Sequence, residues 1–133
     1  MLMDKKDFVF CRAPRVLLID DDPLFGVILF RVALAGKIAL NHVVSPGAVE
    51  ADKIRETYDF IITDYDLGNI TGVQLIHSLE ACNQALPTIL VSSYRGIPSP
   101  NLPQSILYSI HKCEGPQRIL YAAVHAFNEI VSS

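Results

Sequence analysis

The chain has 133 residues, 50% of them hydrophobic, which fits one domain with its own core. Its formal net charge of −3 at pH 7 argues against binding of nucleic acid or anionic membranes. Its three cysteines are an odd number without CxxC spacing, so we expect reduced thiols rather than disulfide bonds or a zinc site. The longest apolar stretch, residues 24–36, is too short to span a bilayer, and the N-terminus lacks the long apolar region of a secretory signal, so we expect a cytoplasmic protein whose partner is another protein.

Short apolar runs alternate with segments of helical character from residue 15 onward. Runs of strand length lie at residues 15–20, 40–44, 60–64, 88–92 and 106–110. Helices are predicted from Pro23 to Gly36, from Pro46 to about Thr57, around Val73 to Leu79 and from Ile119 to Ile130. This alternation predicts an α/β fold with a parallel sheet, right-handed crossovers and helices on both faces. We therefore expect residues 1–14 to be a leader and residues 15–133 to form the domain.

Three prolines interrupt the segment between the fourth and fifth predicted strands, at Pro98, Pro100 and Pro103. Proline lacks a backbone donor and disfavours helical conformation at the residue before it. We therefore expect residues 93–105 to be irregular or to contain only a shortened helix.

Polar side chains stand at the ends of the predicted strands: Asp20, Asp21 and Asp22 after the first, Asp64 at the third, Ser92 at the fourth and Lys112 after the fifth. Ligands of open parallel sheets bind beyond the carboxyl ends of the strands. Clustered carboxylates repel one another unless a cation neutralises them, and Mg²⁺ prefers a few carboxylates together with water and phosphate oxygens. The sequence therefore predicts a Mg²⁺ site. Asp22 is left out of it, because an aspartate directly before Pro23 is better explained as a helix N-cap.

Asp64 is the candidate nucleophile of this site, because an aspartate carboxylate can form an aspartyl phosphate. The Lys112 ammonium and the Ser92 hydroxyl can then hold the phosphoryl oxygens as charge builds in the transition state. The four histidines are scattered without ligand spacing, so none is assigned chemistry.

Two segments resemble the response-regulator receiver domains of two-component signalling systems. The string Val-Leu-Leu-Ile-Asp-Asp-Asp-Pro at residues 16–23 resembles the opening of such a domain, and Asp-Tyr-Asp-Leu-Gly-Asn-Ile-Thr-Gly at residues 64–72 resembles its phosphorylation loop. The resemblance runs from about Arg15 to the C-terminus. It implies a flavodoxin-like, doubly wound five-stranded parallel sheet of order 2-1-3-4-5.

The resemblance also implies a phosphoprotein of a phosphorelay, which takes its phosphoryl group from a histidine kinase or histidine phosphotransfer protein. The implied site consists of a metal-binding acid pair at Asp20 and Asp21, the phosphoacceptor at Asp64, a metal-binding backbone carbonyl at Asp66, a switch hydroxyl at Ser92 and a phosphate-contacting lysine at Lys112. Such a domain is no conventional enzyme, although with Mg²⁺ it catalyses its own phosphorylation and dephosphorylation. A downstream protein target is implied, and a second copy of the chain is a further candidate partner.

The sequence departs from the family pattern at two positions. Receivers commonly follow the lysine with a cis proline, whereas this chain has Cys113, so we expect a trans bond there and a different aim for Lys112. The family usually carries a switch aromatic three positions before the lysine, where this chain has Ser109. Tyr108 is no simple replacement, because neighbouring strand residues point to opposite faces. A weakened or altered switch is expected.

Two other functions remain open. A receiver fold with degenerate switching would act as a protein-interaction module that signals by docking alone. The string Asp64-Tyr-Asp66 also resembles the nucleophile motif of haloacid-dehalogenase-type phosphatases, but that interpretation leaves Asp20 and Asp21 unexplained. Separately, residues 24–30 carry more apolar area than one buried stripe needs, so we expect either a kinase-docking surface there or packing against the leader or the last helix.

Overall fold

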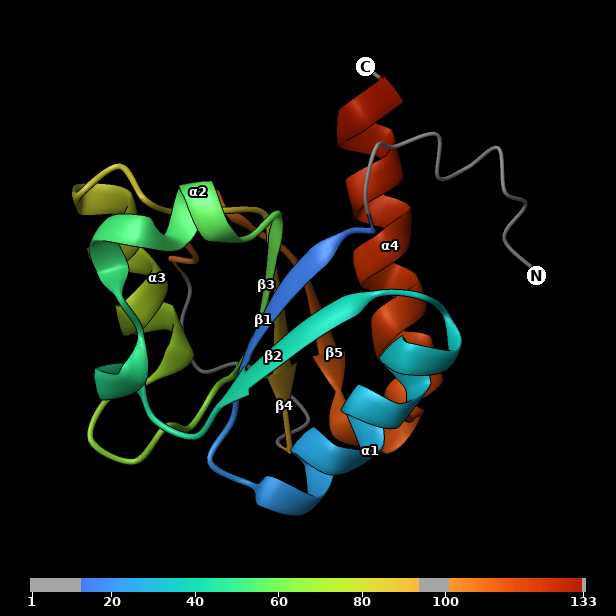
Figure 1. Ribbon diagram of the computed structural model, residues 1–133. Helices are drawn as coiled ribbons and strands as arrows, with labels where there is room; N and C mark the ends of the chain where they lie inside the picture. The colour runs from blue at the N-terminus through green and yellow to red at the C-terminus, as the bar shows by residue number, and fades with distance from the viewer. Residues whose placement is uncertain (1–12, 94–100, 133) are drawn as a thin grey trace.

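The computed structural model describes residues 13–93 and 101–132. Its centre is a five-stranded parallel sheet in the order β2-β1-β3-β4-β5 (Figure 1). The strands are β1 (Arg15–Ile19), β2 (Ala39–Val43), β3 (Phe60–Asp64), β4 (Thr88–Ser92) and β5 (Ile106–His111). The predicted fold class and strand order are thereby confirmed. Most of the predicted leader lies outside the described residues.

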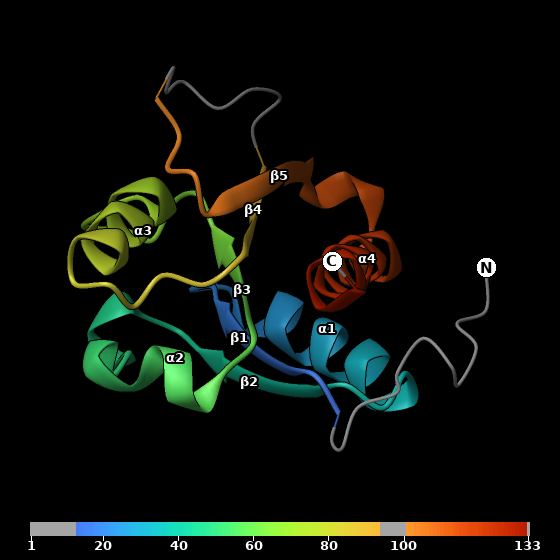
Figure 2. The same ribbon diagram turned by 90° about the horizontal axis from the view of Figure 1, so that it is seen from above.

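Helices cover both faces of the sheet, as Figure 2 shows. One face carries α1 (Pro23–Ala35) and α4 (Pro116–Ser132), and the other carries α2 (Ile54–Thr57) and α3 (Gly72–Ala81). In β1 the side chains of Val16 and Leu18 join the core under α1 and α4, whereas Leu17 and Ile19 join the core under α2 and α3. Side chains on both faces of this strand are buried, which explains why its sequence is a continuous apolar run.

Side-chain caps begin the two helices that follow β1 and β3. The Asp22 carboxylate accepts hydrogen bonds from the backbone N–H groups of Leu24 and Phe25 at 3.0 and 3.3 Å, which confirms its predicted role as the N-cap of α1. Thr71 caps α3 through a capping box with Gln74, in which each side chain accepts a hydrogen bond from the other residue's backbone N–H. Both helices therefore begin just beyond the carboxyl edge of the sheet.

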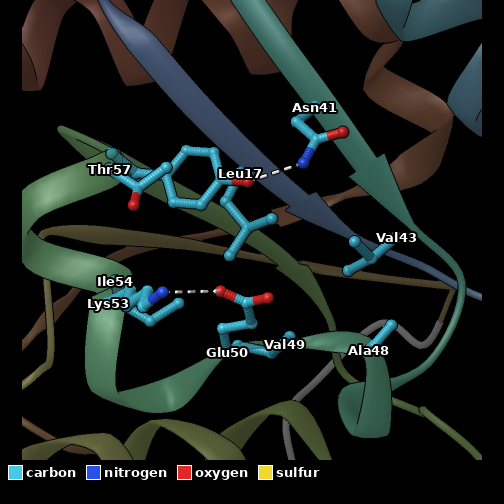
Figure 3. Close-up of a pocket in the computed structure, with 10 residues that line it drawn as sticks. Leu17, Asn41, Val43, Ala48, Val49, Glu50, Lys53, Ile54 and Thr57 are labelled. Carbon is cyan, nitrogen blue, oxygen red and sulfur yellow. Dashed lines mark hydrogen bonds and ion pairs between the residues drawn. The ribbon is translucent and has the colours of Figure 1, made fainter.

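The segment after β2 differs from the expected single helix. It forms two short 3₁₀ turns, Pro46–Ala48 and Ala51–Lys53, followed by the one-turn helix α2. Without a longer helix, a hollow of about 260 Å³ lies beneath α2, and Asn41 at its margin donates a hydrogen bond to the Tyr58 hydroxyl (Figure 3).

The segment between β4 and β5 is described only from residue 101, since residues 94–100 lie outside the described residues. Residues 101–105 contain a turn and no helix, which agrees with the expectation for this part of the segment. The pairing of β5 with β4 then skips Leu107, because Thr88 pairs with Ile106 and Ile89 pairs with Tyr108. No helix in the part of the chain that the structure describes is long and apolar enough to cross a membrane.

Candidate functional site

The predicted site residues meet at the carboxyl edge of the sheet. Asp64 ends β3 and Ser92 ends β4, while Asp20 and Lys112 directly follow β1 and β5. Asp20, Asp64 and Ser92 are buried, and the Asp21 side chain is exposed. One carboxylate oxygen from each of Asp20, Asp21 and Asp64 lies within 4.8 Å of the other two. The structure thus brings together the three acids that the sequence predicts as metal ligands.

The Asp20 side chain is fixed by one of its two oxygens. Its Oδ1 accepts a hydrogen bond from the Asp22 backbone N–H at 2.9 Å. Its Oδ2 is completely buried and has no hydrogen-bond partner of good geometry, although the Lys112 ammonium lies 2.8 Å from it as an ion pair. A buried carboxylate oxygen without a hydrogen bond of good geometry is a suitable ligand for a metal cation, because coordination would neutralise its charge.

His42 holds the backbone beside this acid. Its Nε2 donates a 2.7 Å hydrogen bond to the Asp20 carbonyl oxygen. The ring lies against Gly26 of α1, where an added Cβ would overlap it. No motif marks His42 in the sequence, and its role depends on a contact between α1 and β2 that residue spacing does not reveal.

Lys112 is the cation that faces the acids. Its Nζ lies 2.8 Å from Asp20 Oδ2 and 3.6 Å from Asp64 Oδ2, and 4.7 Å from the centre of the Phe25 ring. Burial favours the neutral amine, but the close ion pair with Asp20, followed by the charges of Asp64 and Asp22, outweighs burial and raises the pKa of Lys112. The lysine therefore stays cationic and partly neutralises the carboxylates.

The Asp64 carboxyl group nevertheless ionises less readily than an ordinary aspartate. Burial, followed by repulsion from Asp20, raises its pKa from 3.8 to about 6, against the opposing effect of the Lys112 ammonium. A single lysine thus leaves the three acids incompletely neutralised. A divalent cation would lower the pKa of Asp64 and keep its carboxylate ionised at neutral pH.

The loop after Asp64 is folded tightly against the end of β3. The Gly72 N–H donates a 2.7 Å hydrogen bond to the Tyr65 carbonyl oxygen, and a Cβ at Gly72 would overlap the Asp64 carbonyl oxygen. Gly72 therefore serves backbone geometry at the start of α3 rather than contact with a ligand. Asp66 lies in this loop, and its side chain accepts a hydrogen bond from the Gly68 N–H at 3.0 Å. The metal-binding role of the Asp66 carbonyl stays a prediction.

The turn that carries Lys112 is held by a histidine. Among the described residues no peptide bond is cis, so the bond from Lys112 to Cys113 is trans, as expected. His111 Nδ1 accepts a hydrogen bond from the Cys113 N–H at 3.0 Å, which leaves the ring's hydrogen on Nε2, where it can donate to the Ser93 carbonyl oxygen at 2.9 Å. His111 thereby connects the lysine turn to the residue after Ser92, a link that sequence reasoning missed.

The face of β5 near Ser109 is open. A hollow of about 280 Å³ lies between β5 and α4, with Tyr108 and Ser109 on one side and Tyr121 and His125 on the other. The Tyr121 and His125 rings stack with their centres 6.0 Å apart. The Tyr108 side chain is 40% exposed, so it does not fill the core position of the expected family aromatic.

By sequence, no family model and no curated protein matches the chain. Its structure has the CheY-like fold of response-regulator receiver domains. A receiver domain protein from Methanospirillum hungatei superposes with a TM-score of 0.72, at 16% identity, over 88% of this chain and 95% of that chain. The chemotaxis response regulator CheY4 of Vibrio cholerae superposes with a TM-score of 0.68, at 17% identity, over 86% of this chain and 98% of that chain.

Proposed function

We propose that residues 15–133 form a phosphoacceptor signalling domain that receives a phosphoryl group on Asp64 from the phosphohistidine of a histidine kinase or phosphotransfer protein. One observation carries this proposal: three carboxylates and one lysine from three separate segments of the chain converge at the carboxyl edge of a receiver-type sheet. A purely structural cluster would gain little from three acids that face a single lysine.

Each residue has a role in the proposed reaction. An Asp64 carboxylate oxygen attacks phosphorus, the P–O bond forms as the P–N bond to the donor histidine breaks, and the imidazole leaves with a proton. The Lys112 ammonium and the Ser92 hydroxyl hold the phosphoryl oxygens. The carboxylates of Asp20, Asp21 and Asp64 and the backbone carbonyl of Asp66 would hold Mg²⁺, which supplies charge neutralisation at the phosphoryl oxygens. Water attack on the aspartyl phosphate later returns free Asp64.

The exposed side of α1 is proposed as the surface for the phosphodonor. Leu24, Val27, Ile28 and Phe30 are large apolar side chains that are 40–66% exposed on this helix, next to the acid pair that follows β1. A patch of this kind favours contact with a protein, and its position would bring a docked donor close to Asp64. A cytoplasmic location, shared with the donor, belongs to the same proposal.

A second candidate is a receiver-fold module that signals by docking alone. The observation that favours it is the exposed face of β5, where Ser109 lacks the ring of a switch aromatic and a hollow separates β5 from α4. In that case the domain would bind partners without taking up a phosphoryl group. Labelling with acetyl phosphate distinguishes the two candidates.

The test is incubation with acetyl phosphate and Mg²⁺, followed by intact mass measurement. We expect one added phosphoryl group that hydroxylamine removes, and no addition to Asp64→Asn. The matched control is Asp52→Asn, because the Asp52 side chain is exposed and outside the carboxylate cluster; it should label like the wild type. Undiminished labelling of Asp64→Asn would refute the nucleophile assignment, and an unlabelled wild type would favour the docking module.

A further inference from the structure

We propose that Phe25 is a positioning residue, whose ring holds the Lys112 ammonium over Asp20 and Asp64 through a cation–π contact. This inference rests on the proposed phosphorylation of Asp64 and adds a residue to it that no motif marks. The Lys112 Nζ lies 4.7 Å from the centre of the Phe25 ring, within the range of about 6 Å at which a cation is attracted to an aromatic face.

A further contact is needed to fix the position of the Lys112 ammonium, because the backbone of the turn does not determine the conformation of this long side chain. Lys112 begins a 3₁₀ turn after β5, and its flexible four-carbon stem can place the ammonium in many positions. Cys113 follows it in a trans peptide bond, so no proline ring limits the turn. The Lys112 side chain is only 18% exposed, which makes the described contacts with two carboxylates and one ring decisive for its position.

The ring itself is well placed to act as a fixed point. Phe25 lies in the first turn of α1, where its N–H donates to the Asp22 cap at 3.3 Å. Its half-buried side chain packs against the core between α1, α4 and the sheet. The acid pair, the cap and the ring therefore follow one another within six residues, and the helix start that orders Asp20 also orders Phe25.

The ring differs from the two carboxylates in one respect that matters for the reaction. During phosphorylation Asp64 becomes an acyl phosphate, and its negative charge moves outward onto the phosphoryl oxygens. A divalent cation bound to the acids would also compete with Lys112 for Asp20. Both changes alter the attraction that holds Lys112 in the unphosphorylated site. The Phe25 face keeps its charge distribution throughout, so it retains the ammonium near the carboxylates while the lysine turns to the phosphoryl oxygens.

The first experiment detects the contact without metal or phosphodonor. In the NMR spectrum of the unphosphorylated protein, the ring current of Phe25 should move the Lys112 ε-CH₂ protons upfield of their ordinary position. Phe25→Leu should abolish that displacement, and Phe25→Tyr should restore it. The matched control is Phe127→Leu, which alters a second half-buried phenylalanine of the same core and should leave the Lys112 protons displaced. An undisplaced Lys112 signal in the wild type would overturn the proposal.

The second experiment measures the rate of labelling by acetyl phosphate at saturating Mg²⁺. Removal of a cation–π contact at a partly exposed site implies about a two- to fivefold slower reaction for Phe25→Leu. Phenylalanine analogues with one to three ring fluorines at position 25 should slow it progressively, because fluorine weakens the ring's attraction for a cation without much change in shape. In a Lys112→Met background, Phe25→Leu should have no further effect.

The outcomes separate the two proposals. Equal rates for the wild type, Phe25→Leu and the fluorinated proteins would overturn the positioning role, as would an equal slowing by Phe127→Leu, which would indicate a general packing defect. If the wild type itself is not labelled, the proposed function fails. The NMR displacement then still decides whether Phe25 holds Lys112: its loss in Phe25→Leu supports the contact, and an unchanged signal overturns it.

Discussion

Replacing Asp64 by Asn should stabilise the folded protein at neutral pH while it removes the phosphoacceptor. The Asp64 carboxyl is buried beside Asp20, and its pKa rises from 3.8 to about 6 in the folded protein, first through burial and then through that neighbour. The folded state therefore binds the proton of Asp64 more tightly than the unfolded chain does. An amide of the same shape carries no charge at any pH and escapes this penalty.

The size of the effect follows from the pKa displacement. One pKa unit corresponds to about 1.4 kcal/mol, so ionising Asp64 in the folded protein costs at most about 3 kcal/mol more than in the unfolded chain when the pKa is about 6. The stability that protonated Asp64 provides is fully present below pH 4 and is lost as the pH rises through about 6. Relaxation around the site reduces the figure, so we expect about 1–3 kcal/mol.

Urea unfolding at pH 4 and pH 7.5, without divalent cations, measures this difference. The stability of Asp64→Asn relative to the wild type should increase by about 1–3 kcal/mol between the two pH values, whereas the relative stability of Asp52→Asn should stay nearly constant. Mg²⁺ should stabilise the wild type at pH 7.5 and narrow its gap to Asp64→Asn. If the stability of Asp64→Asn relative to the wild type did not change with pH, the raised pKa assigned to Asp64 in the folded protein would be refuted.

Two further changes test the surroundings of the site. Gly72→Ala should destabilise the fold by about 1–3 kcal/mol in urea unfolding, because its Cβ would overlap the Asp64 carbonyl oxygen. Unaltered stability would show that the loop shifts to accommodate the added methyl group at little energetic cost. Leu24→Gln, on the exposed face of α1, should slow transfer from a phosphohistidine protein but leave acetyl phosphate labelling intact, while Leu107→Gln on β5 should change neither. Equal losses of Leu24→Gln with both donors would exclude a docking role.

The strand ends could be located from the sequence because buried parallel strands have a simple signature. Each is a short apolar run, and the polar residue that ends it must leave the core at the same edge of the sheet. The same signature places Asp20, Asp64, Ser92 and Lys112 at one edge of the sheet. Asp22 could be separated from the metal ligands for an equally local reason, since the cap of α1 depends only on its immediate neighbours.

Other features depend on contacts between distant segments, which the sequence does not display. Phe25, His42 and His111 have no distinctive spacing, and each acts through a partner 18 to 87 residues away. For His111 the decisive detail is which ring nitrogen accepts a hydrogen bond, and that depends on the path of the turn. The breaking of the second helix into 3₁₀ turns has the same cause, because helix propensity is weak and tertiary packing overrides it.

The close approach of Gly26 to His42 also has a consequence for how this sequence can change over generations. A side chain at position 26 would displace the imidazole that donates a hydrogen bond to the Asp20 carbonyl oxygen. A substitution on α1 would therefore change the position of Asp20, because His42 on β2 contacts both residues. A smaller residue at position 42 removes the obstacle but also removes the hydrogen bond. We therefore expect glycine at position 26 and histidine at position 42 to be gained or lost together in homologous sequences.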